Sequence, residues 1–584
     1  MDYYGPMSSF KRRATPTLLL WLLISLVCSI AAAAPPEVEP ADSGLSGELF
    51  YQLLVGEISA QNGDAASAYS LMLDAARKAN SEQLFERAVT LALGARSGES
   101  ALFAAQAWVR SFPASEQANR YQLQILIGLN KISETVEPLK RALAQTKGNA
   151  RIAVINQIPR YFARATDKKE ATVAVESALT TELSDVTMGP AAWATVGTLR
   201  LMAGDVEGAA NAARRGAAFN THSDEVAALA LGLWDAKSPA AEALLQHYLA
   251  RKASPEIRLA YARRLLGAQR GADAYEQTVK ATQESADYAD AWLVRGSLEF
   301  QDKKNDAAQS SLQKYIALRT STEADAADNQ RGLTQAYVLL SQIAEQAHQP
   351  AEALAFLQKI DSTQDALQIQ VRKAAILAQQ GKMAEARALI RELPEQQADD
   401  ARLKISAEVQ LLRDNKQYAQ AYAVLTEAVQ RFPDDADLKY DQAMVAEKLD
   451  KLPEMERLLR EVIAAKPDYQ HAYNALGYSL ADRNLRLPEA RSLIRKALDL
   501  TPNDPFIMDS LAWVEFRSGN LAEALRVLTE AYTARPDAEI AAHLGEVLWA
   551  LQRRDDARKT WKEGLALNPD NETLQETMQR LNKP

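Results

Sequence analysis

Histidines, paired carboxylates and the single cysteine are the side chains of this sequence that could do covalent or metal chemistry. A metal site on a helix needs two ligands about one helical turn apart. No two histidines have that spacing, because they stand at His222, His247, His348, His471 and His543. The sequence also has no phosphate-binding loop, no Gly-x-Ser-x-Gly motif and no dinucleotide-binding fingerprint. Paired carboxylates are common here, as on any solvated helix surface. We therefore expect no enzyme, no metal ion and no cofactor.

The composition indicates which elements hold these side chains. The 584 residues are rich in Ala, Leu, Glu, Gln, Arg and Lys, and only 7% are aromatic, a bias typical of long helical arrays. The net charge is −9, both signs are well mixed, and no basic tract stands out. Because nucleic-acid binding needs a basic patch, we expect no nucleic-acid partner.

Prolines and small residues recur at a fixed spacing toward the C-terminus. Five prolines follow one another at intervals of 34, 35, 34 and 33 residues: Pro433, Pro467, Pro502, Pro536 and Pro569. Twelve residues before each stands a small or modest residue: Ala421, Met455, Ala490, Ala524 and Ala557. Five residues before each stands another: Ala428, Val462, Ala497, Ala531 and Gly564. Columns that keep one period predict a repeated pair of helices.

Close packing of helix pairs explains these columns. Where two helices cross at short range, a side chain larger than alanine pushes their axes apart, which costs roughly 1–3 kcal/mol. Proline ends the second helix because it cannot continue the hydrogen-bond ladder. Glycines five residues before a small residue predict the turn inside a pair, where a positive φ is easily met: Gly63, Gly204, Gly381 and Gly519.

The period and its columns resemble the tetratricopeptide repeat, a helix–turn–helix module of 34 residues. The resemblance is strongest over residues 401–570, and residues 47–400 carry more divergent repeats. It implies an all-α fold in which roughly fifteen helix pairs stack into a right-handed superhelix, an α-solenoid. We also expect a longer loop near residues 320–331 and a capping helix over residues 571–584.

The resemblance assigns the residues of the first helices that line the inner wall of such a superhelix. In the last four units these positions hold Tyr440, Asp441, His471, Asn474, Tyr478, Asp482, Phe506, Asp509, Trp513, Phe516, Arg517, His543, Glu546 and Trp549. Aromatic side chains among charges suit recognition of an extended polypeptide, so we expect a protein-binding groove. The alternative is that some of the aromatics pack against the first helix of the neighbouring pair. The carboxylate clamp of chaperone-binding repeats is not expected, because Asn474 is its only partial match.

The N-terminal 33 residues have the features of a secretory signal peptide. A basic run at 11–13 precedes an apolar stretch at 18–30, and Ala31 and Ala33 fit the two recognition positions of a cleavage site. The apolar stretch is shorter than the about 20 residues that a membrane span needs. Residues 34–46 are predicted to be a flexible leader. We therefore expect an exported protein located in the periplasm.

Cys28 is the only cysteine, and it lies inside that apolar stretch. A lipid-modified cysteine usually follows a small residue and has Leu three positions before it, whereas here Val27 precedes it and Ser25 stands three before. We interpret Cys28 as an apolar residue of the signal core, with lipid modification as the alternative. Membrane association is expected only if Cys28 is lipid-modified.

Two longer stretches are similar to a group of proteobacterial cell-envelope repeat proteins. They read HAYNALGYSLADRNLRLPEARSLIRKALDLTPNDPFIMDSLAWVEFRSGNLAEALRVL and ELFYQLLVGEISAQNGDAASAYSLMLDAARKANSEQLFERAVTLAL. The best-known member of the group is an outer-membrane lipoprotein, the adaptor of a periplasmic carboxyl-terminal processing protease. The resemblance implies a scaffold that binds the protease and presents cell-wall hydrolases to it. The poor lipidation context of Cys28 departs from that group.

The sequence therefore predicts an exported, non-enzymatic scaffold whose partners are other proteins. Its sharper form is an adaptor between a periplasmic protease and its substrates. The alternative is a structural scaffold for envelope assembly, in polysaccharide export or in the insertion of outer-membrane proteins.

Overall fold

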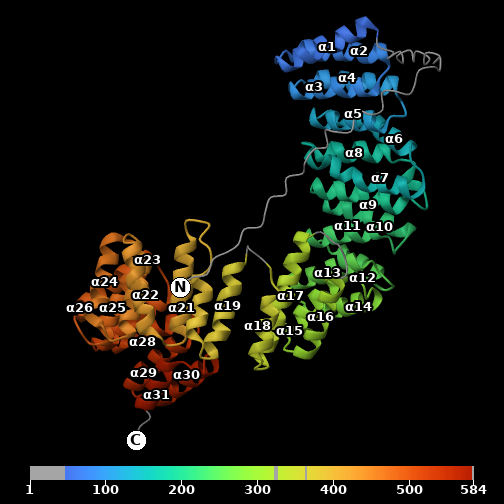
Figure 1. Cartoon of the computed structure of the whole chain (residues 1–584). Helices are drawn as coiled ribbons and strands as arrows, with labels where there is room; N and C mark the ends of the chain where they lie inside the picture. The colour runs from blue at the N-terminus through green and yellow to red at the C-terminus, as the bar shows by residue number, and fades with distance from the viewer. Residues whose placement is uncertain (1–45, 321–325, 362–364, 582–584) are drawn as a thin grey trace, which may run out of the picture. The chain divides into compact units, whose positions relative to one another are not determined.

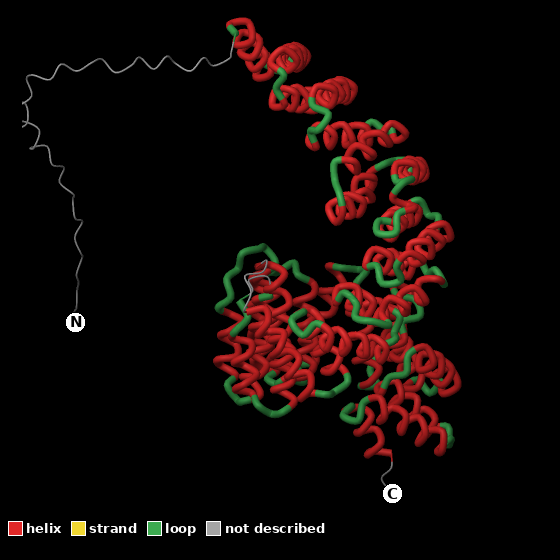
Figure 2. The backbone as a smooth tube through the Cα atoms, turned by 90° about the vertical axis from the view of Figure 1, so that its right-hand side faces the viewer, coloured by secondary structure: helices red, strands yellow, loops and turns green. Residues whose placement is uncertain are grey.

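Helices joined by short turns make up the described chain. The computed structural model describes residues 46–320, 326–361 and 365–581. Over those residues it contains α-helices and three short 3-10 helices, and it has no β-strand (Figure 2). The all-α fold class predicted from the sequence is confirmed. The predicted signal peptide, Cys28 and residues 34–45 of the predicted leader lie outside the described residues.

The chain divides into two compact units (Figure 1). Unit 1, Met1–Ala268, contains α1 Gly47–Gln61, α2 Ala65–Ala79, α3 Glu82–Gly94, α4 Gly98–Ser111, α5 Glu116–Gly128, η1 Ile132–Thr135, α6 Val136–Ala144, α7 Gly148–Tyr161, η2 Phe162–Arg164, α8 Lys168–Ala178, η3 Glu182–Ser184, α9 Gly189–Met202, α10 Val206–Phe219, α11 Asp224–Asp235, α12 Ala240–Leu249 and α13 Pro255–Gly267.

Unit 2, Gln269–Pro584, contains α14 Gly271–Glu284, α15 Ala289–Gln301, α16 Asn305–Thr320, α17 Ala326–Gln346, α18 Pro350–Gln358, α19 Ala366–Gln379, α20 Met383–Arg391, α21 Asp400–Asp414, α22 Tyr418–Arg431, α23 Ala436–Lys448, α24 Leu452–Ala465, α25 Gln470–Asp482, α26 Leu487–Leu500, α27 Pro505–Arg517, α28 Leu521–Ala534, α29 Ala538–Ala550, α30 Arg554–Leu567 and α31 Glu572–Leu581.

Odd-numbered helices are the first members of most pairs and even-numbered helices the second. First and second helices pack together in α1–α2, α15–α16 and α29–α30, for example, and within each unit successive pairs also pack on one another (Figure 1). The regular order is interrupted in unit 1 between α5 and α9. There the three 3-10 helices occur, α7 carries Pro159, and α7 packs on α9. The prediction of a longer loop near 320–331 is wrong for residues 326–331, because these residues belong to α17.

The turn inside a pair has one recurring backbone feature. In fourteen pairs the second residue after the first helix has a positive φ. The four glycines predicted for these turns all show it, with φ between 78° and 85°. In the other ten turns a residue with a side chain takes the left-handed conformation: Arg96, Asn130, Lys237, Gln269, Lys303, His348, Lys416, Asp450, Asn484 and Gln552.

The proline and small-residue columns lie where close packing predicts. Each of the five prolines stands two residues after the end of a second helix, from α22 to α30. All five residues of the first small column are fully buried. Glycine in a first helix also meets the next helix closely, because a Cβ atom on Gly477 would lie 2.6 Å from Ile494. The columns therefore mark contacts between neighbouring helices.

The last helix of the described chain packs back on unit 2. Leu574 of α31 is fully buried in the cluster that α29 and α30 form. Arg580 pairs with Glu546 of α29 at 2.6 Å. Glu572, at the start of α31, pairs at 2.8 Å with Lys416 in the turn between α21 and α22. That ion pair joins parts of the chain 156 residues apart, so the start of α31 lies beside the turn between α21 and α22.

Candidate protein-binding groove

The first helices of unit 2 bring many of the predicted wall residues together. Tyr478 of α25 lies 3.4 Å from the His543 Nε2 of α29. Asp509 of α27 has both carboxylate oxygens 2.9 Å from the His543 Nδ1. Trp513, also on α27, stacks on His543 with ring centroids 4.3 Å apart and donates its Nε1–H to Asp482 at 3.2 Å. We call these five residues the His543 cluster.

Burial corrects the wall assignment for four of the predicted residues. The exposed fraction is 6% for Asp509, 4% for Trp513, 2% for His543 and 6% for Glu546. Asp509, Trp513 and His543 are buried because they contact one another between α27 and α29. Glu546 is buried because Arg580 of α31 covers it. The alternative of packing between first helices therefore holds for these four, and they do not form an open wall.

The other predicted wall residues keep some contact with solvent. His471, Asp482 and Phe506 are exposed. The half-buried members are Tyr440, Asp441, Asn474, Tyr478, Phe516, Arg517 and Trp549. Arginines cover three of the aromatic rings: Arg535 lies over Phe506, Arg517 over Trp513 and Arg554 over Trp549. The assignment of these accessible residues to a protein-binding groove stays a prediction.

A cavity of about 370 Å³ opens between α21 and α23, and two of the accessible wall residues, Tyr440 and Asp441, line it. We call it the groove cavity, and its lining residues are Gln410, Arg413, Asp414, Tyr418, Tyr440, Asp441, Met444 and Lys448. The Tyr440 ring also meets Tyr469 at 5.5 Å and His471 at 6.3 Å. Aromatic faces and charges of both signs thus share one hollow, which suits the side chains and backbone of an extended segment.

The electrostatics of the groove cavity favour a polar occupant. Burial raises the pKa of Asp441, although nearby Arg413 opposes the rise. Burial also raises the pKa of Glu447, six residues further along α23, against a hydrogen bond from Ser479. Over the described residues, Arg413 and Lys448 form no ion pair within 4 Å. The Asn474 Oδ1 on α25 is buried and has no hydrogen-bond partner among the described residues.

Sequence reasoning missed the half of the groove cavity that α21 provides. Gln410, Arg413 and Asp414 stand eleven, eight and seven residues before Ala421. Trp513, Phe516 and Arg517 stand at the same distances before Ala524. Extending the wall positions one unit toward the N-terminus would have found them.

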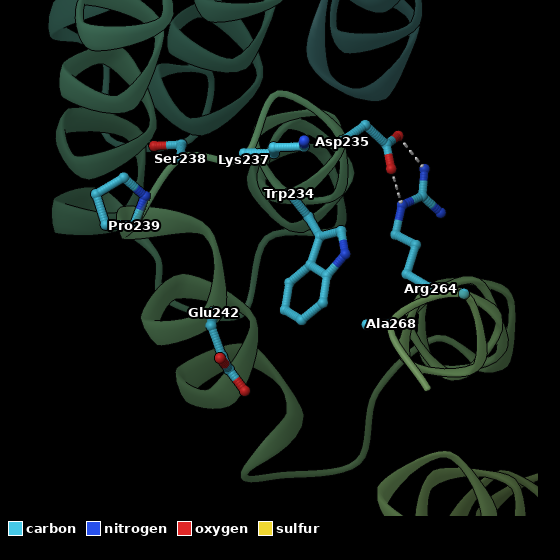
Figure 3. A pocket seen from close by; sticks show the side chains of 9 residues that line it. Trp234, Asp235, Lys237, Ser238, Pro239, Glu242, Arg264 and Ala268 are labelled. Carbon is cyan, nitrogen blue, oxygen red and sulfur yellow. Dashed lines mark hydrogen bonds and ion pairs between the residues drawn. The ribbon is translucent and has the colours of Figure 1, made fainter. Parts of the chain in front are cut away.

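Unit 1 contains a separate pocket that the sequence did not indicate (Figure 3). It has a volume of about 580 Å³ and lies among the end of α11, the start of α12 and the end of α13. The Trp234 ring extends into it and meets Tyr261 edge-to-face at 5.6 Å. Arg264 donates two hydrogen bonds to Asp235 across one side. Two of the charged side chains that line this pocket, Arg264 and Asp235, therefore pair with each other.

Unit 1 also exposes large apolar side chains on its first helix. The exposed fractions are 58% for Phe50, 64% for Tyr51, 47% for Leu54 and 47% for Ile58. The outer face of a terminal repeat is normally polar, since no further repeat covers it. Contiguous exposed apolar side chains indicate a contact surface. We call these four residues the α1 face.

The described residues contain neither a metal-binding cluster nor a membrane-spanning helix. Within residues 46–320, 326–361 and 365–581, no group of three or more His, Cys, Asp or Glu side chains is arranged to hold a metal ion. None of the described helices is both long enough and apolar enough to span a bilayer.

Segments of the C-terminal part match the tetratricopeptide repeat. Two models of this repeat match the chain, one at residues 406–454 and 440–505 and the other at 515–581. Modules of this kind mediate contacts between proteins and are generally not catalytic. The repeats in these matched segments indicate a scaffold for protein–protein contacts.

Among known proteins, the chain is similar to the TPR repeat-containing protein PA4667 of Pseudomonas aeruginosa, with 40% identity over 211 residues. The aligned part spans 36% of this chain and 36% of the relative. A solved structure of TTC0263, a thermophilic TPR protein of Thermus thermophilus, is 20% identical, with a TM-score of 0.28, and covers 30% of this chain and 94% of its own. MamA of Desulfovibrio magneticus is 14% identical, with a TM-score of 0.25, and covers 29% and 95%.

Proposed function

We propose that the chain is an exported adaptor of the bacterial cell envelope, located in the periplasm with or without attachment to the outer membrane. It binds a periplasmic carboxyl-terminal processing protease and presents protein substrates, such as cell-wall hydrolases, to it. The resemblance of both ends of the sequence to the envelope repeat proteins supports this proposal. The observation that carries it is the presence of two separate accessible surfaces, the groove cavity in unit 2 and the α1 face in unit 1.

An adaptor must hold two proteins at once, so it needs two surfaces of different character. The groove cavity combines Tyr418 and Tyr440 with charges of both signs, and such a hollow fits an extended segment of a substrate. The α1 face is apolar, and the carboxylates beside it are neutralised by ion pairs of Glu48 with Lys78 and of Glu57 with Arg87. An apolar face with paired charges at its edge fits the surface of a folded partner. We assign substrates to the groove cavity and the protease to the α1 face.

Photocrosslinking in living cells tests both assignments. A photoreactive residue replaces Tyr51 on the α1 face, His471 beside the groove cavity, or Leu567 as the control, which is an exposed apolar residue at the end of α30. We expect the protease to be captured from position 51 and its substrates from position 471. Capture of the same proteins from position 567 would contradict the assignment. Capture of export or membrane-insertion components would instead favour a scaffold for envelope assembly.

Reconstitution tests the activity itself. The purified chain is added to the protease and a cell-wall hydrolase, and the rate of hydrolase cleavage is measured. We expect faster cleavage with the unaltered chain and a loss of that effect in a Phe50→Ser, Leu54→Ser double variant. If the hydrolase is cleaved at the same rate with and without the chain, the adaptor function is wrong.

A further inference from the structure

The His543 cluster joins three successive first helices through one buried imidazole. His543 is on α29, Asp509 on α27 and Tyr478 on α25. The Tyr478 contact passes over the intervening pair, so α25 and α29 are tied directly as well as through α27. Trp513 stacks on the imidazole and donates to Asp482 at the end of α25. Repeats of this class mainly contact their neighbours, so this tie across two pairs is an additional constraint on how tightly unit 2 is wound.

The charged groups around His543 are mostly acidic. From α25 the titratable groups are Asp482 and Tyr478, and from α27 they are Asp509 and Arg517, whose guanidinium lies over the Trp513 ring. The α29 helix itself provides Glu539 and Glu546. From α31, Arg580 faces the same interior and pairs with Glu546 at 2.6 Å. Asp509 and Glu546 are the buried carboxylates of this group, and Arg580 pairs with Glu546, so a protonated His543 would be the positive partner of Asp509.

We propose that His543 is a proton-dependent clasp that holds α25, α27 and α29 together when the imidazole is protonated and loosens them when it is neutral. In the protonated form, Nδ1–H donates to Asp509 and Nε2–H donates to Tyr478. Loss of the proton to solvent leaves a neutral ring that donates to Asp509 and accepts from the Tyr478 hydroxyl. The hydrogen bonds can remain, but the buried Asp509 carboxylate then has no positive partner in the cluster, and water entry between α27 and α29 becomes favourable.

The direction of the titration agrees with this geometry. Burial alone lowers the pKa of His543, but the charge of Asp509 and its hydrogen bond outweigh burial and raise the pKa above the ordinary value of 6.5. Burial raises the pKa of Tyr478, and Asp482 and Asp509 raise it further, so the phenol keeps its proton. Because the folded-state pKa of His543 is raised, the stabilisation is fully present below the unfolded pKa. It is lost as the pH rises through the folded pKa.

The clasp would control how closely the two ends of the C-terminal repeats approach each other. The ion pair between Lys416 and Glu572 marks their contact, and the winding of α25–α29 would set their separation. Any effect of the clasp on partner binding rests on the proposed groove. The conformational change does not depend on the groove, so it can be tested without a partner, and a negative result would leave the proposed function untouched.

Spin labels at the two ends of these repeats measure the change directly. The chain has no cysteine after residue 28, so cysteines at Gln417 and Glu576, both exposed, are labelled and their distance is measured by pulsed electron paramagnetic resonance. We expect a narrow distribution at about pH 5.5 and a longer, broader one at about pH 9. In His543→Gln, we expect the broad distribution at both values. His348→Gln, at an exposed position in the turn after α17, is the matched control and should behave like the unaltered chain.

Fluorescence provides a second readout that does not depend on folding of the His543 variant. A protonated imidazole quenches a stacked indole, so the difference between the unaltered chain and Trp513→Phe reports protonation of His543. We expect this difference to titrate with a midpoint above 6.5. The proposal is overturned if the spin-label distance is the same at both pH values. It is also overturned if the pH dependence survives in His543→Gln or if the fluorescence midpoint lies below 6.5.

Discussion

Gly545 of α29 and Trp561 of α30 are in contact so close that a side chain on the first would occupy the space of the second. A Cβ atom on Gly545 would lie 1.9 Å from the Trp561 Nε1. The indole is fully buried, and its Nε1–H donates to the Ala542 carbonyl at 3.3 Å. The ring therefore cannot move aside without losing both packing and a hydrogen bond. The repeat keeps glycine here because the helices of the pair touch at this point.

Gly545→Ala should destabilise unit 2 by about 3 kcal/mol, because the clash falls on a rigid ring. Chemical denaturation followed by circular dichroism measures the loss. Gly94→Ala is the control, since Gly94 ends α3 and a Cβ atom there would meet nothing within 4 Å. The control should be neutral or stabilising by up to about 1 kcal/mol. Equal effects of the two substitutions would contradict the packing assignment.

Ala524→Leu should cost roughly 1–3 kcal/mol, because Ala524 is fully buried between α28 and its neighbours. Since each repeat contacts mainly its neighbours, hydrogen exchange should speed up in α27–α30 and remain unchanged in unit 1. Ala534→Leu provides the comparison, because Ala534 is exposed at the end of the same helix. Unchanged exchange in α27–α30 would show that the small column does not mark a close crossing.

Trp513→Ala should destabilise the chain by roughly 3–5 kcal/mol, because the ring is buried in the His543 cluster. It is therefore a variant of the core and does not test binding. His471→Ala changes an exposed residue beside the groove cavity and should alter stability by less than about 0.5 kcal/mol. Thermal unfolding distinguishes the two. A stable Trp513→Ala chain would show that the tryptophan belongs to an open wall after all.

Asp441→Asn should raise the Tm of unit 2 at neutral pH. Burial raises the pKa of Asp441, and a carboxyl group with a raised folded pKa stabilises the fold below its unfolded pKa. That stabilisation is lost as the pH rises through the folded value. An amide avoids the loss, so the variant and the unaltered chain should differ at about pH 7 and converge near pH 3. Asp434→Asn, at an exposed turn position, should not change Tm. A lower Tm for Asp441→Asn at neutral pH would mean that the carboxylate has a stabilising partner.

Spacing alone predicted the parts of the fold that a single helix pair determines. The prolines after α22 to α30, the buried alanines and the turn glycines such as Gly519 follow from close approach and backbone conformation, which act over a few residues. The same reasoning could not foresee the stretch between α5 and α9, where 3-10 helices replace the regular turns. No glycine or proline period marks that stretch.

The candidate site was predicted less completely because burial depends on how tightly successive repeats are wound. Asp509, Trp513 and His543 occupy wall positions, yet contacts across α25, α27 and α29 bury them. Winding is a property of several pairs together and leaves no mark in one repeat. The α1 face was missed for a different reason: Phe50 and Tyr51 look like core residues in the sequence. They differ from core residues only because no neighbour among the described residues packs on them.

The left-handed turn residues have a consequence for engineering. Ten turns place a side chain where glycine would meet no steric resistance, and each such residue carries a small conformational penalty. Glycine at Lys303 or Gln552 would relieve it without touching a buried contact or an accessible surface, and the gains should add because the turns are far apart. Glycine substitutions at several of these turns should therefore raise the thermal stability of the scaffold and leave its recognition surfaces unchanged.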